Sequence, residues 1–300
     1  MTTEQWKLHA IVTPSGQIYQ VSSLQYDPGI ELAKIKGDGK LSPQFVAKMK
    51  EQQSFKVTST AIAAVLTVFG NAFKYFDAPV TLYYAKHELG AAIATGAVHK
   101  SVTMARCCFV PTKTSASDGK EATIDFDLYP IATGDDTSPV TLNSSVSLPA
   151  ITVANQVYTV GAATANGTSI NGLEDITINY GYKVNMKSSN GSLYTTFASY
   201  EEFAPTISFK THTPFQFGGL TGTGVTQASH FWLRKKAPNG GGNVPAGTAE
   251  HIKFTITSGF FQPANIDDDD ERTSTDEIEC HPVDDGTNAI MAISLASTIA

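Results

Sequence analysis

Residues that could bind a metal or catalyse a reaction are present in this 300-residue chain, but at spacings that such sites do not use. His87 and Glu88 begin like the helical zinc-protease motif, in which a second histidine follows four positions after the first. Ala91 occupies that position, so one metal ligand is missing. An ordinary polar pair is the better interpretation.

The three cysteines are a second candidate metal set. Cys107 and Cys108 are adjacent, and Cys280 directly precedes His281. Two adjacent ligands fit a tetrahedral zinc ion awkwardly, and the two-residue spacing typical of zinc sites is absent from the sequence. An odd number of cysteines with one adjacent pair is also a poor disulfide framework. We therefore expect reduced, buried thiols and no metal or other cofactor.

The strongest chemical signal is an acidic stretch, residues 267–285, which contains ten carboxylates and one arginine. Its charge of −9 exceeds the −7 of the whole chain, so the remainder carries +2. Because like charges repel, such a cluster has to be solvated, to bind cations or to present a negative surface. It lacks the alternating ligands and central glycine of a calcium loop. The stretch begins with five consecutive acids: Asp267, Asp268, Asp269, Asp270 and Glu271.

Enzymatic function is not predicted. Gly119 and Lys120 lack the other residues of a phosphate-binding loop, and no serine lies in a nucleophile elbow. A hydrolase that uses two of the carboxylates remains an alternative, although no pairing is visible in the sequence. Tight nucleic-acid binding is disfavoured, because the chain has three arginines against eighteen lysines. Its one concentrated basic patch, residues 234–236, is typical of a solvated strand end.

Most of the chain alternates apolar and polar residues in short runs, the two-residue period of a half-buried strand. Turn sequences such as Asp27-Pro28-Gly29 and Asn190-Gly191 separate these runs. We therefore predict a mostly β fold, an antiparallel β-sandwich or barrel-like arrangement with one or two short flanking helices and long loops. The clearest strand patterns lie at residues 17–21, 80–84, 123–129, 156–160, 176–182, 206–210 and 251–257.

Three segments have helical character. Ser42 and Pro43 resemble an N-cap and a first helical residue, and apolar residues spaced three and four apart predict a helix as far as Gln53. Residues 60–69, which end before a glycine, predict a second helix, although their β-branched content leaves a buried strand open. Residues 85–95 form a third, weaker candidate that Gly90 interrupts.

The length of the chain fits one β-rich structural domain over residues 1–300. Residues 133–172 are rich in Ser, Thr, Ala and Asn and predict an inserted lobe or a long hairpin excursion. No run approaches the roughly 18 apolar residues of a membrane span. The first residues lack a basic region followed by an apolar one, so we expect synthesis and folding in a cytoplasm, with no membrane partner.

The order of these elements resembles that of the tail tube (major tail) proteins of long-tailed bacteriophages. The resemblance covers roughly residues 1–130 and 200–300. It is carried by an opening strand pair at residues 6–21, the turn at 26–31, the Gly37-Asp38-Gly39 loop, the helix predicted after Ser42, the segment 56–69, the strand at 254–261 and the acidic turn.

The resemblance implies a virion structural protein that catalyses nothing. Copies would close a hexameric ring, and rings would stack through a long loop and the termini into a hollow tube, with a β-sandwich flanked by a helix in each subunit. The implied partners are further copies, other virion tail proteins and DNA that passes transiently along an acidic lumen. Residues 36–55, including Lys36, Asp38, Phe45 and Phe55, are then candidates for ring-to-ring contact. Asp267 to Glu271 would face the lumen or another ring.

Two other hypotheses remain open. A head decoration, neck or capsid-associated protein would share the β-rich, non-catalytic character. A carbohydrate-binding or adhesion module would instead use aromatic side chains such as Trp232, Tyr180 and Tyr182.

Overall fold

The computed structural model describes residues 5–36, 42–70, 74–87, 92–151, 156–212, 221–267 and 275–299. Strands hold 62% of the chain and helix 3%, and the named strands pair in antiparallel fashion. The predicted mostly β, antiparallel fold is therefore confirmed. None of the described helices is long and apolar enough to cross a membrane.

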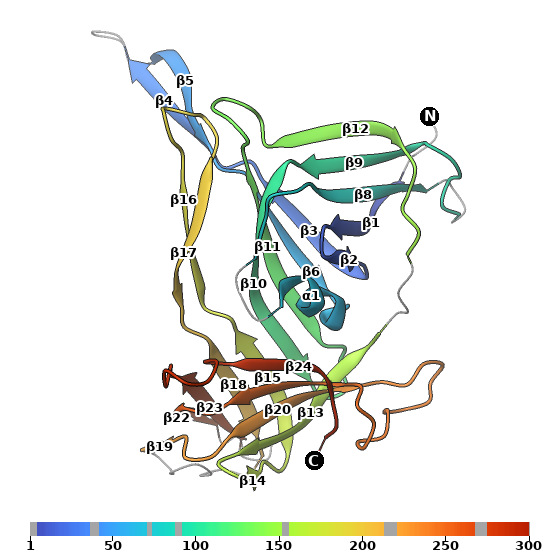
Figure 1. Cartoon of the computed structure of the whole chain (residues 1–300), viewed down its shortest axis with the longest axis vertical. Helices are drawn as coiled ribbons and strands as arrows, with labels where there is room; N and C mark the ends of the chain where they lie inside the picture. Colours follow the sequence, from blue (N-terminus) through green and yellow to red (C-terminus); the bar gives the residue numbers. More distant parts are fainter. Residues whose placement is uncertain are drawn as a thin grey trace.

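Three sheets form the body of the molecule (Figure 1). The first has five strands in the order β12 (Val140–Val146), β9 (His99–Met104), β8 (Val80–His87), β1 (Gln5–Thr13) and β2 (Gly16–Ile18). Another five-stranded sheet has the order β14 (Thr168–Ser169), β13 (Tyr158–Ala165), β20 (Ser229–Lys235), β21 (His251–Ile256) and β24 (Ala292–Ser297).

The largest sheet, of ten strands, connects these two. Its order is β19 (Thr223–Gly224), β22 (Gly259–Asp267), β23 (Thr275–Pro282), β18 (Thr206–Thr211), β15 (Leu173–Asn179), β10 (Arg106–Ser117), β11 (Thr123–Ile131), β6 (Ser54–Ser59) and β3 (Val21–Asp27), and β7 (Lys74–Phe76) also pairs with β10. Two separate hairpins complete the strands: β4 (Ile30–Lys36) with β5 (Pro43–Glu51), and β16 (Tyr182–Lys187) with β17 (Phe197–Phe203).

The core lies between the sheets and is rich in aromatic side chains. Phe109 of β10 stacks on Phe126 of β11 with ring centroids 4.8 Å apart, and both are fully buried. The helix α1 (Ile62–Phe69) buries Ile62, Val65, Leu66 and Phe69 against them, so the prediction of a helix at residues 60–69 is confirmed. Phe69 meets Tyr180 edge-on at 5.9 Å. Such contacts bury large areas and stabilise the body strongly.

Two other helix predictions are wrong. Residues 43–51 form the strand β5, in which Phe45 and Ala47 share one face and Val46 and Lys48 the other. A short apolar run is compatible both with the 3.6-residue period of a helix and with the two-residue period of a strand. The pairing of this segment with β4 favours the strand. Residues 85–87 belong to β8, and Ile93 forms an isolated bridge with His87, so the helix predicted at 85–95 is absent from its described part.

Residues 133–172, which were expected to form an inserted lobe, contribute strands to two sheets. β12 lies at one edge of the first five-stranded sheet, whereas β13 lies inside the other, between β14 and β20. Tyr158 and Ala163 of β13 belong to the main core cluster. The excursion therefore shares the core with the rest of the body.

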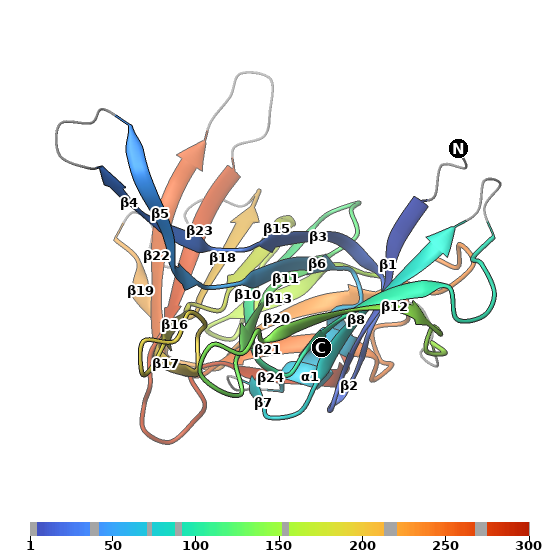
Figure 2. The same ribbon diagram turned by 90° about the horizontal axis from the view of Figure 1, so that it is seen from above.

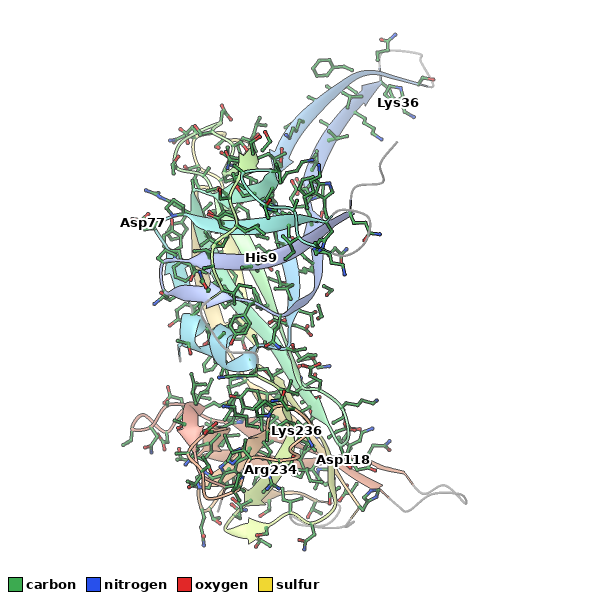
Figure 3. All side chains as sticks on the ribbon, turned by 90° about the vertical axis from the view of Figure 1, so that its right-hand side faces the viewer. His9, Lys36, Asp77, Asp118, Arg234 and Lys236 are labelled. Carbon is green, nitrogen blue, oxygen red and sulfur yellow. The ribbon has the colours of Figure 1, made fainter. Side chains whose placement is uncertain are left out.

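The β4–β5 hairpin projects from the body (Figures 1 and 2). In Figure 2 it lies on the opposite side of the molecule from β1. Figure 3 shows Lys36 near the far end of this hairpin, away from His9 and the other labelled residues. We refer to residues 30–36 and 43–51 as the arm.

Candidate assembly surface

The arm is a two-stranded ribbon, and most of its side chains are exposed among the residues that the structure describes. β4 and β5 pair with each other, and within the described residues neither is hydrogen-bonded into one of the three sheets. An isolated two-stranded hairpin is marginally stable in water, because it buries little apolar surface. The arm therefore has the character of an element that is completed by a partner.

Large apolar side chains on the arm are exposed to an unusual degree. Six of them are between 47% and 59% exposed: Ile30, Leu32, Ile35, Phe45, Val46 and Met49. Ile35 is the cross-strand partner of Phe45, and Ala33 is that of Ala47. Because side chains two residues apart share a face, these four residues form one continuous apolar face. A contiguous exposed apolar surface is typical of a protein-binding site.

Charged residues alternate with the apolar ones. The described arm contains four lysines, Lys34, Lys36, Lys48 and Lys50, against Glu31 and Glu51, so it carries a net charge of +2. Lysines on a free strand edge discourage unspecific strand pairing. They also favour a partner surface that is negative.

The root of the arm is fixed by a buried polar cluster. Glu51 is only 7% exposed, forms an ion pair with Lys48 and accepts a hydrogen bond from the Gln53 side chain. The backbone N–H of Glu51 donates to the carbonyl of Leu193 at 2.7 Å. The Lys48 ammonium lies 5.5 Å from the centre of the Tyr194 ring. These contacts fix the direction in which the arm leaves the body.

A tight turn at the start of β4 also fixes the direction in which the arm leaves the body. Gly29 has a φ of +53°, and a Cβ on it would lie 2.1 Å from the carbonyl oxygen of Gln52. Its own carbonyl accepts the N–H of Gln52 at 3.1 Å, and Asp27 accepts the N–H of Gly29 at 2.9 Å. Only glycine fits this close approach between the two strands.

No protein-family model matches the sequence, and no curated protein matches it significantly.

The residues that the sequence selected for ring-to-ring contact fall into three environments. Lys36 and Phe45 lie on the arm and are exposed, so the structure brings these two together. Phe55 lies in β6 of the body, is 3% exposed and has its ring centroid 4.9 Å from that of Tyr26. Asp38 lies outside the described residues. The structure adds Ile35, which is the cross-strand partner of Phe45 and shares its face.

The acidic stretch is less uniform than its composition suggests. The backbone of Asp267 ends β22 and pairs with Thr275, whereas Asp268, Asp269, Asp270 and Glu271 lie outside the described residues. Asp276 is 1% exposed, so one of the ten carboxylates is buried. At the other end of the stretch, the Asp285 carboxylate accepts hydrogen bonds from the side chain and backbone of Asn288 and from the backbone of Thr287, which lowers its pKa to about 2.

The cysteines do not converge. Cys107 and Cys108 lie on β10 and Cys280 lies on β23, with β15 and β18 between them. All three are buried, and burial raises the pKa of Cys108 and of Cys280 to about 12. Across the described ranges, no group of three or more His, Cys, Asp or Glu residues is placed to hold a metal ion.

The aromatic residues considered for sugar binding are covered. Trp232 is 2% exposed and donates its indole N–H to the carbonyl of Thr298 at 3.0 Å. Tyr180 is fully buried, and the ring of Tyr182 stacks on Phe203 at 4.4 Å. None of these three offers an open ring face to a ligand.

Proposed function

We propose that this protein is a self-assembling virion structural protein whose copies associate head to tail into stacked, hexameric rings of a bacteriophage tail tube. The observation that carries the proposal is the arm, with its six half-exposed apolar side chains on a ribbon that lacks a partner. Burying such side chains contributes roughly 25 cal/mol per Å² of apolar surface, so the arm gains most by contacting another protein surface.

A second copy is the simplest source of that surface. Several strands at sheet ends, among them β3 and β12, are bonded on one side only within the described residues. Exposed edges invite pairing, and a closed ring of identical subunits removes them. The arm then supplies the ring-to-ring contact expected of residues 36–55, with Lys36 and Phe45 as contact residues.

The overall charge supports the passage of DNA rather than its retention. The chain carries −7 and has only three arginines, and the acids from Asp267 to Glu271 provide a candidate lining of the lumen. Like charge close to a phosphate backbone repels it, which lowers friction for a moving duplex. The proposed location is the virion tail, beside other tail proteins.

The test is the assembly state of the purified protein across a range of concentrations and salt. We expect the wild type to form rings or tubes in negative-stain micrographs, with masses from light scattering that are multiples of 32.0 kDa. A variant with Ile35→Asp and Phe45→Asp should remain a folded monomer, because burying two carboxylates in an apolar contact is unfavourable.

The control is Val283→Asp, which places one such carboxylate at an apolar residue that is 55% exposed on the body. It should assemble like the wild type. A wild-type chain that stays monomeric under every condition contradicts the proposal. Shell-bound or isolated copies would instead favour a head decoration, neck or capsid-associated protein.

A further inference from the structure

A second apolar surface lies on the body over β8, β9 and β12, with Trp6 of β1 at one end and the strands β3 and β6 at the other. It consists of two adjoining hollows of about 320 Å³ and 460 Å³, which share Tyr84, Val102 and Leu142. We refer to this surface as the groove and define it by its apolar lining: Tyr26, Phe55, Tyr84, Val102, Val140 and Leu142.

The groove is accessible along its length. Leu142 is 79% exposed, more than any other large apolar side chain of the described ranges, and Tyr26 is 45% exposed. Among the described strands, β12 pairs only with β9 and β3 only with β6, so both are open edges. An extended segment that entered the groove would find apolar side chains together with free backbone groups, the combination that strand addition uses.

We propose that the arm of a second copy occupies this groove, with the apolar face formed by Ile35 and Phe45 packed against Leu142 and its neighbours. This inference rests on the proposed function and names the surface that receives the arm. The contact has to be intermolecular: each arm projects away from its own body, which leaves its Phe45 58% exposed and its Leu142 79% exposed (Figures 1 and 2).

Charge determines which end of the groove the arm occupies. Three exposed carboxylates adjoin lining residues of the Tyr26 end in the sequence: Asp27 follows Tyr26, and Asp135 and Asp136 precede Ser138, which lines the smaller hollow. Glu51 and Lys48 of the chain's own arm also act on Tyr26, and their charges offset each other. Asp136 is held there, because it accepts the N–H of Leu193 at 3.0 Å. At the opposite end the Lys100 ammonium lies 4.5 Å from the ring centre of Trp6. An arm of charge +2 is attracted to the first end and repelled from the second.

The arm and the groove are different surfaces of one chain, so in the proposed assembly each copy donates an arm to one neighbour and receives an arm from another. Such head-to-tail contacts generate closed rings or open filaments, whereas two copies that exchanged arms reciprocally would stop at a symmetric dimer.

Two complementary variants test this arrangement. Leu142→Asp places a carboxylate in the apolar groove and leaves the arm unchanged. Ile35→Asp with Phe45→Asp places two carboxylates on the apolar face of the arm and leaves the groove unchanged. Each variant alone should lose rings and tubes, with the dissociation constant raised roughly 30-fold or more, as for a central interface residue. An equimolar mixture should form dimers that contain one copy of each variant and grow no further, because only one intact arm can meet one intact groove.

Light scattering of the mixture, with one variant carrying a mass tag, distinguishes the outcomes. Val283→Asp controls for added charge, and circular dichroism of each variant controls for folding. If Leu142→Asp assembles like the wild type while the arm variant does not, the arm docks elsewhere; the inference is then wrong and the proposed function stands. If the mixture stays monomeric while both variants are folded, the inference is also wrong. Wild-type protein that never assembles contradicts both.

Discussion

The body and the arm use the same kinds of residues in opposite ways. In the body, Phe109 and Phe126 are fully buried and stacked at 4.8 Å. On the arm, Phe45 and Ile35 are directly paired across the hairpin, yet each is more than half exposed. Apolar side chains in the first region stabilise the subunit, whereas those in the second can stabilise only a complex. Under the proposed function, the body folds alone and the arm is completed by association.

The sharpest test of this division is a matched pair of truncations. Phe126→Ala removes a fully buried ring, which typically costs about 3–5 kcal/mol of unfolding free energy. Phe45→Ala in the monomer should change it by no more than about 0.5 kcal/mol, as at an exposed site. Denaturant unfolding at a concentration below assembly measures both values. Equal losses in the two variants would show that the arm packs against its own body.

Removing the whole arm also compares the contributions of the arm and the body to stability and assembly. Glu31 and Lys50 are cross-strand partners, so a two-residue Asn-Gly turn can join them in place of residues 32–49. We expect the shortened chain to melt within about 3 °C of the wild-type monomer and to lose assembly. A deletion of residues 36–55 should destabilise the body instead, because it also removes the buried ring of Phe55. Thermal melts followed by circular dichroism compare the two deletions.

The root of the arm should show an intermediate effect. Glu51→Ala removes the ion pair with Lys48 and leaves the Gln53 amide without its carboxylate partner. Loss of a buried hydrogen-bond partner costs about 1–3 kcal/mol. Because the cluster lies where arm and body meet, we expect faster amide hydrogen exchange along β4 and β5 with little change in the core strands.

Glu31→Gln is the control for the root, since it changes an exposed glutamate on the arm. It should leave the exchange rates unaltered. Uniformly faster exchange in β10 and β11 of the Glu51 variant would mean that this cluster supports the whole body rather than the direction of the arm.

Sequence patterns predict the body better than the arm, for a physical reason. Strands such as 123–129 alternate cleanly because one face is buried, and α1 has enough apolar residues at helical spacing to be recognised. In β5, Phe45, Val46 and Met49 are spaced as in an amphipathic helix. Because most of β5 is exposed in the subunit, its sequence carries no clear alternation of buried and exposed residues that would distinguish a strand from a helix. The pairing of β5 with β4, as between Phe45 and Ile35, decides for a strand, and the pattern of residues 43–53 by itself does not contain this pairing.

The candidate site was predictable only in part. Lys36 and Phe45, which the sequence selected, lie exposed on the arm, whereas Phe55, a few residues further on, is buried in β6. The point at which the chain passes from arm to body depends on Glu51 and its contact with Leu193, which lies far away in the sequence. The groove was not predictable at all, because Tyr26, Tyr84 and Leu142 come from three distant strands.

The smallest expected effect concerns a loop of the body that needs no neighbour. The Asp285 carboxylate accepts the side-chain amide of Asn288 at 2.9 Å, the backbone N–H of Asn288 at 2.7 Å and that of Thr287 at 2.9 Å. These bonds lower the pKa of Asp285 to about 2, below the roughly 3.9 of an unfolded chain. A group whose pKa is depressed on folding stabilises the fold above the unfolded pKa, and this contribution is lost as the pH falls from about 4 towards 2.

Asp285→Asn should therefore flatten the acid dependence of stability slightly between pH 4 and pH 2, and leave assembly at neutral pH unchanged. Asp118→Asn, on another exposed turn of the body, is the control. The direct measurement is an NMR titration of the Asp285 side chain. A midpoint near 4 would show that these hydrogen bonds are not formed in solution.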